Sequence, residues 1–239
     1  MKIGVALSGC DIGGVAAYSA LQEIENQGFE IEMVSSSGVA SMSGAMFALG
    51  CEEEIYRQAM DSFMADIRTD GMDTAIYNLS QRIQNSPQTR KIPLAINSVN
   101  MADQKTVTFT NDFVLSSQTV MTYPLQELYD AFSASISQVE GLGYYRFIGY
   151  RLCDYSILHG CPLYPLRMQG IKHVVSISFM PERLSTPYEA MAKKIVDQSA
   201  LGADWHLTLR MPANKSPAEY MEWVSLQVNA FALGIKATL

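Results

Sequence analysis

The chain has 239 residues, of which 48% are hydrophobic and 17% charged, and its formal net charge is −7. This composition is too apolar and too weakly charged for a disordered chain. The acidic excess argues against nucleic-acid binding, which depends on clustered Lys and Arg, and against broad electrostatic attraction to anionic membranes.

Cysteine and histidine spacing indicates no metal module. The cysteines contain no CxxC pair, and the histidines form no HExxH motif, so neither a zinc site nor a dense disulfide framework is expected. No cofactor is expected either. The residues concerned are Cys10, Cys51, Cys153, Cys161, His159, His173 and His206. Reduced thiols fit a cytoplasmic protein.

The start of the chain leaves no room for a signal peptide, and no run of about 18 apolar residues predicts a transmembrane segment.

Short apolar strands alternate with helices in the first half of the chain. Each strand meets a turn of small residues, and the helical stretches carry apolar residues at helical spacing. The expected elements are a strand at 3–7, a helix from 17 to a Gly28 cap, a strand at 29–34, a helix at 39–49 and a polar helical stretch at 52–82.

The second half continues this alternation around a hairpin-like pair of strands. The expected elements are strands at 93–99 and 105–110, a helix at 125–135, an ambiguous aromatic-rich segment at 141–152, strands at 173–179 and 204–211, a helix at 189–201 and a helix from Pro217. No repeat or linker interrupts the chain, so we expect a single domain over 1–239. The strand–helix order predicts a three-layer α/β/α sandwich with a largely parallel central sheet.

Two turns of small residues invite a functional interpretation. The first follows the first strand, but Asp11 stands where a dinucleotide fingerprint needs its second glycine, and no P-loop Gly-Lys-Ser/Thr follows. A structural turn and an oxyanion-type loop both remain open there. The second turn lies within 33–44 and has the strand–turn–helix context of a nucleophile elbow without its G-x-S-x-G motif.

These segments together resemble the bacterial patatin-like phospholipase family. The resemblance covers nearly the whole chain, although each motif alone is weak. It is carried by the opening strand and Gly-rich turn at 3–16, the elbow flanks at 31–34 and 44–48, the segments at 93–95 and 130–135, Asp154 with 160–163, and the stretches at 170–175 and 203–204.

The resemblance implies a Ser–Asp dyad with a Gly-rich oxyanion loop. The family's G-x-S-x-G corresponds to positions 36–40, so Gly38 stands at the nucleophile position, and Asp154 matches the aspartate base. The loop positions are Gly9, Cys10, Asp11, Gly13 and Gly14. Gly38 has no side chain, and Asp11 would bring negative charge near an oxyanion. The differences from the family pattern therefore affect the catalytic positions and leave the residues that form the fold unchanged.

The leading interpretation is therefore a catalytically inactive relative that binds an acyl or lipid-like ligand or a protein partner. The alternative is an active serine esterase or lysophospholipase that uses Ser37 or Ser36 with Asp154. Serines in such a turn are more often helix caps, and Ser35 or Ser37 could cap the helix that follows. At an elbow, Gly38 should have a positive φ.

Aromatic residues in two places suggest core packing or an interface. Tyr144, Tyr145, Phe147 and Tyr150 form a cluster that is more typical of core or interface than of a cofactor site. The C-terminal helix carries Trp223 and Phe231. These residues fit a homodimer contact or packing within one chain.

Overall fold

A largely parallel sheet forms the centre of the molecule. The structure, a computed structural model, describes residues 1–9, 11–89, 91–115, 117–137, 143–184 and 186–238. Its strand order is β5-β4-β3-β2-β1-β8-β9, with β7 pairing to β3 and β6 pairing to β7. The strands are β1 (Lys2–Gly9), β2 (Glu30–Gly38), β3 (Leu94–Asn100), β4 (Thr106–Thr110), β5 (Val120–Pro124), β6 (Tyr145–Phe147), β7 (Tyr150–Asp154), β8 (Val174–Pro181) and β9 (Trp205–Met211).

Strand β1 lies at the middle of the sheet, between β2 and β8, and is parallel to both. Its Val5, Ala6 and Leu7 are fully buried. A strand covered on both faces needs such a continuous apolar run. Strands β3 and β9 extend the parallel set outward. The predicted parallel core is therefore confirmed.

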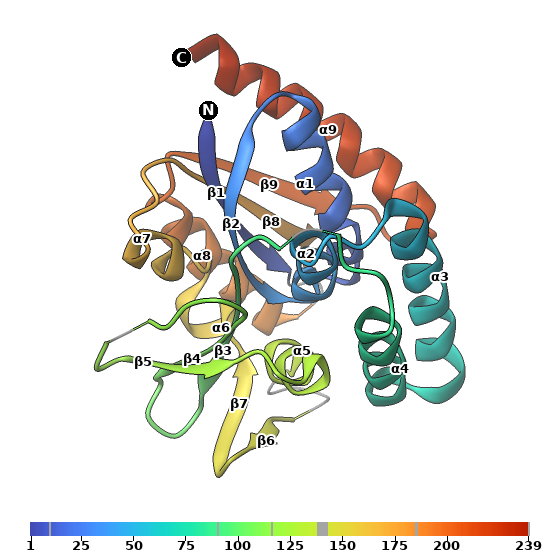
Figure 1. Cartoon of the computed structure of the whole chain (residues 1–239), viewed down its shortest axis with the longest axis vertical. Coiled ribbons are helices and arrows are strands. Elements are labelled where there is room, and N and C mark those ends of the chain that lie inside the picture. The colour runs from blue at the N-terminus through green and yellow to red at the C-terminus, as the bar shows by residue number, and fades with distance from the viewer. Residues whose placement is uncertain (10, 90, 116, 138–142, 185, 239) are drawn as a thin grey trace.

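Helices cover both faces of this sheet (Figure 1). On one face, Gly44 of α2 lies against Leu7 and Val34, and a Cβ at this glycine would stand 3.0 Å from Leu7. On the other face, Gly4 of β1 lies against Leu166 of α7. The helices are η1 (Ile12–Ala16, a 3-10 helix), α1 (Ala17–Asn26), α2 (Ala40–Ala48), α3 (Glu53–Asp70), α4 (Met72–Gln84), α5 (Leu128–Ile136), α6 (Ser156–His159), α7 (Tyr164–Met168), α8 (Pro187–Ala200) and α9 (Pro217–Thr238).

The polar helical stretch predicted at 52–82 is two helices. Gly71, with a φ of 86°, separates α3 from α4. Glycine adopts this positive φ at little cost, and the turn there ends the first helix and starts the second. The C-terminal helix α9 packs on α1 and buries Val224, Val228 and Ala232. Among the described residues, no helix is both long and apolar enough to cross a bilayer.

Strand β3 has two different neighbours along one edge. Its first residues pair with β2, in parallel, as far as Ser36 opposite Ile96. Its last residues pair with β7, in antiparallel register, with Ser98 opposite Asp154. The predicted hairpin-like pair is β3 and β4, and the segment that the sequence left ambiguous is the β6–β7 hairpin. Strand β5 was not predicted. This change of neighbour brings the end of β7 to the end of β2.

Candidate functional site

Gly38 is the last residue of β2 and turns the chain directly into α2. Its φ is 65°, the left-handed value predicted for an elbow. Its N–H donates to Ser135 Oγ of α5 at 3.0 Å, and its carbonyl accepts from Ser41 Oγ at 2.7 Å. Both polar groups of this residue are therefore satisfied by side chains from two different helices.

Asp154 ends β7 and is 1% exposed. Its Oδ1 accepts the N–H of Ser156 at 3.0 Å and the Ser156 hydroxyl at 2.7 Å. Its Oδ2 lies 3.4 Å from the place where a Cβ on Gly38 would stand. The structure therefore brings the nucleophile position and the aspartate side by side. Burial raises the pKa of the Asp154 carboxyl to about 6, and the Ser156 hydrogen bonds oppose that rise.

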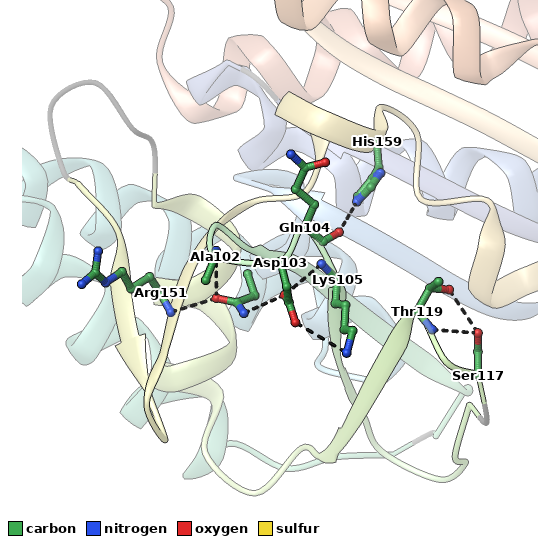
Figure 2. A network of polar contacts seen from close by, with 9 residues as sticks. Ala102, Asp103, Gln104, Lys105, Ser117, Thr119, Arg151 and His159 are labelled. Carbon is green, nitrogen blue, oxygen red and sulfur yellow. Dashed lines mark hydrogen bonds and ion pairs between the residues drawn. The ribbon is translucent and has the colours of Figure 1, made fainter.

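A polar network fixes the segment that carries Asp154. Asn100 Oδ1, at the end of β3, accepts the backbone N–H of Arg151 at 3.2 Å, and its Nδ2 donates to Asp103 at 2.7 Å. His159, at the end of α6, donates through Nε2 to the Gln104 carbonyl at 3.1 Å (Figure 2). The β3–β4 turn thus holds both β7, which precedes Asp154 along the chain, and α6, which follows it.

The end of β1 blocks the space at Gly38. The Gly9 carbonyl oxygen accepts the N–H of Val39 at 3.1 Å. A Cβ on Gly38 would stand 2.0 Å from that oxygen and 2.8 Å from its carbon. Any side chain at position 38 would therefore overlap backbone atoms. The atom nearest to that position is therefore a hydrogen-bond acceptor, whereas an oxyanion hole needs N–H donors.

The rest of the Gly-rich loop closes on itself. Asp11 caps η1, and its Oδ1 accepts the Gly13 N–H at 2.7 Å. Burial raises the pKa of the Asp11 carboxyl, and the Gly13 hydrogen bond opposes this. Gly14 has no room for a Cβ, which would stand 2.9 Å from the Ala40 N. The loop therefore packs tightly on the start of α2, and the N–H groups of Gly13 and Gly14 both bond to Asp11. Cys10 lies outside the described residues.

The two alternative serines do not stand at the tip of the turn. Ser36 faces the α2 layer, where its Cβ neighbours Gly44, and its hydroxyl donates to the Ala95 carbonyl at 3.4 Å. Ser37, one residue on, projects to the opposite face of the strand. It is fully buried, and its Oγ has no hydrogen-bond partner among the described residues. The expected cap by Ser35 or Ser37 is wrong, because α2 has no side-chain cap.

Sequence reasoning missed Ser41, Ser135 and Ser156, which hold Gly38 and Asp154 in place. The Asp-x-Ser spacing of 154–156 is a local signal, since such a serine can bond back to the carboxylate. No local pattern marks Ser135, because its partner is the Gly38 N–H on a distant segment. Within the described residues, no group of three or more His, Cys, Asp or Glu side chains could hold a metal ion.

A hollow of about 310 Å³ lies beside α5. It is lined by Met72, Asp73, Ile76, Ser133, Ile136, Ser137, Tyr144 and Tyr145. The Ser137 carbonyl accepts the Asp154 N–H at 2.7 Å, so the hollow lies next to the backbone of the site. Its lining mixes apolar side chains with two phenols and one carboxylate.

Comparison with known proteins identifies a structural relative. A scan against protein-family models finds no match, and neither does a search of curated protein sequences. Among solved structures, VipD from Legionella pneumophila aligns with a TM-score of 0.54 at 9% sequence identity over 99% of this chain. The chain spans 66% of the length of VipD. A likeness at this identity shows a shared fold and no activity.

We predict that Gly38→Ala destabilises the protein by about 3 kcal/mol, because it adds a backbone clash to a left-handed φ. The matched control is Gly28→Ala, since Gly28 has a φ of 82° but no atom within 4 Å of its Cβ position. That control should lose only about 1 kcal/mol. Urea unfolding of the two variants measures the difference, and equal losses would contradict the close contact with Gly9.

We also predict a pH-dependent gain for Asp154→Asn. Above about pH 6 the ionised carboxylate lowers the free energy of unfolding by on the order of 3 kcal/mol, because its pKa is raised in the folded state. Below the unfolded pKa of 3.8 the carboxyl is protonated in both states, and this destabilisation disappears. Asn keeps an acceptor for Ser156 and carries no charge. The variant should therefore unfold at higher urea than the parent at alkaline pH, with the gap closing in acid. A gap that does not change with pH, or that Asp112→Asn on the surface reproduces, would refute this.

Proposed function

We propose that this chain is a patatin-like protein that has lost its hydrolase site and acts by binding an acyl or lipid-like ligand or a protein partner. One observation carries the proposal: the Gly9 carbonyl oxygen stands 2.0 Å from the Cβ position of Gly38. The fold shared with VipD and the family resemblance of the sequence support the scaffold.

Each requirement of acyl transfer fails in its own way. A nucleophile needs a side chain at the elbow, and Gly38 offers neither an atom nor space. An oxyanion hole needs free N–H donors, whereas Gly9 presents an oxygen and the Gly13 N–H is bonded to Asp11. Substrate access needs an opening, whereas Gly38, Ser135 and Asp154 are all buried. The aspartate alone remains in position.

The second candidate is a serine esterase or lysophospholipase that uses Ser37 or Ser36 with Asp154. The observation in its favour is the carboxylate itself, whose pKa of about 6 suits a general base near neutral pH. The burial of both serines counts against it, because a substrate would have to displace α2 or the opposite helical layer to reach them.

A ligand fits best in the hollow beside α5. Its volume of about 310 Å³ lies at the lower end of small-molecule sites, and its apolar side chains suit a short acyl chain.

A second copy of the chain is a further partner that we propose. Trp223 and Phe231 are half-buried against the core, whereas Leu226 and Leu233 of α9 are 64% and 51% exposed. Their spacing of two helical turns places both leucines on one face.

The pure protein should not turn over p-nitrophenyl butyrate, and a fluorophosphonate probe should not label it. Loss of the nucleophile removes most of a contribution of roughly 10⁶-fold in triad-type enzymes. Ser36→Ala and Ser37→Ala are the matched controls. Turnover at about 1 s⁻¹ that either alanine variant abolishes would establish the esterase instead.

Light scattering tests the second copy as partner. The proposal predicts a mass of two chains at micromolar concentration, because paired α9 helices would cover the exposed leucines. Leu226→Gln combined with Leu233→Gln should give the mass of one chain without loss of folding. A single-chain mass for the unaltered protein would exclude the homodimer.

A further inference from the structure

The turn of the β6–β7 hairpin has a residue that its backbone disfavours. Ile148 and Gly149 form a two-residue loop with φ values of 45° and 85°. Positive φ at both positions is the pattern of a type I′ turn, for which Asn-Gly is the preferred pair. A β-branched residue at positive φ is strained. Ile148 is also 71% exposed, so packing within the chain does not compensate for the strain.

Two arginines on the same hairpin are placed against each other. Arg146 and Arg151 are direct cross-strand partners, an arrangement that is destabilising for like charges. Their guanidinium carbons lie 5.6 and 5.3 Å from the centre of the Tyr144 ring, and Arg146 donates to the Tyr144 oxygen at 3.2 Å. Neither arginine has a carboxylate partner among the described residues. Among the described residues, two positive charges without a carboxylate partner therefore share one short hairpin in a chain of net charge −7.

These features meet around one hollow. A depression of about 400 Å³ is lined by Arg146, Ile148, Gly149, Tyr150 and Arg151. Arginine is suited to bind phosphate oxygens through paired N–H groups. An exposed aliphatic tip flanked by tyrosine and arginine fits the boundary between lipid headgroups and acyl chains. On such a surface the exposed Ile148 side chain and the two positive charges would both gain favourable contacts.

We propose that the β6–β7 hairpin is a contact surface for an anionic membrane, with Arg146 and Arg151 on lipid phosphates and Ile148 inserted at the headgroup boundary. The contact is local and weak, because two arginines and one aliphatic side chain act against an acidic remainder of the protein. The proposal goes beyond the function proposed above and does not rest on it, since neither Gly38 nor Asp154 takes part.

Vesicle co-sedimentation at low salt tests the proposal. The protein should bind vesicles of phosphatidylcholine with phosphatidylserine and not those of phosphatidylcholine alone, and added salt should release it. Arg146→Gln with Arg151→Gln should lower the bound fraction about tenfold. The matched control is Arg68→Gln with Lys236→Gln, which removes the same charge from α3 and α9 and should leave binding unchanged.

Ile148→Asn separates a membrane role from a structural one. Asn suits the positive φ, so the variant should unfold at a higher temperature than the parent, yet it should bind the acidic vesicles less well. Failure to bind acidic vesicles, equal binding to both vesicle types, an equal loss in the control pair, or unchanged binding by Ile148→Asn would overturn the proposal. Binding of soluble glycerophosphoserine without vesicle binding would also overturn it, since the arginines would then serve a soluble anion.

Discussion

The Gly9 carbonyl oxygen accepts the Val39 N–H at 3.1 Å, and this bond joins the end of β1 to the start of α2. It places an acceptor oxygen at the positive end of a helix, where an elbow would otherwise hold an anion. Position 38 must then be glycine, because a Cβ would overlap that oxygen. Gly14 and Gly9 are equally constrained, since both approach the Ala40 N. The close approach of β1 and η1 to the start of α2 thus requires glycine at all three positions.

The same edge of the sheet brings a buried carboxylate to a glycine whose side-chain position is blocked. Strand β3 exchanges β2 for β7 as its neighbour, and this exchange brings Asp154 to Gly38. The carboxylate is fully enclosed and is hydrogen-bonded by Ser156, a residue that belongs to the same turn. A buried charge without a cation partner is costly, so this aspartate is a burden on stability at neutral pH. This combination of a buried carboxylate and a blocked position beside it is the basis of the binding role that we propose.

The β6–β7 hairpin differs from this edge of the sheet in burial, in the pairing of its polar groups and in backbone strain. At Gly38 the polar groups are paired and closed off from solvent, whereas on the hairpin Arg146 and Arg151 are exposed and lack carboxylate partners among the described residues. Strain at Gly38 is absorbed by the residue type that tolerates it, whereas at Ile148 it is not. Exposed backbone strain and exposed charges without a carboxylate partner are consistent with contact to another molecule, as proposed for the hairpin. Buried polar groups that are all hydrogen-bonded need no such partner.

The sequence by itself determined the fold class, the parallel core and the place of the elbow. Periodicity and small-residue turns are local signals, and runs such as Val5 to Leu7 encode a buried strand directly. The positive φ of Gly38 also followed from the strand–turn–helix context. The break at Gly71 was missed, because an isolated glycine inside a helical pattern is tolerated. Strand β5 was missed as well.

Only the tertiary structure decided what the elbow can do. Three contacts surround Gly38: the Gly9 oxygen fills its side-chain position, Ser135 accepts its N–H, and Asp154 faces it. These contacts exist because β1, α5 and β7 meet at one edge of the sheet. The opposition of Arg146 and Arg151 likewise depends on the register of a hairpin that the sequence left ambiguous. These contacts join residues far apart in the chain or set by strand register, and local propensity carries no information about either.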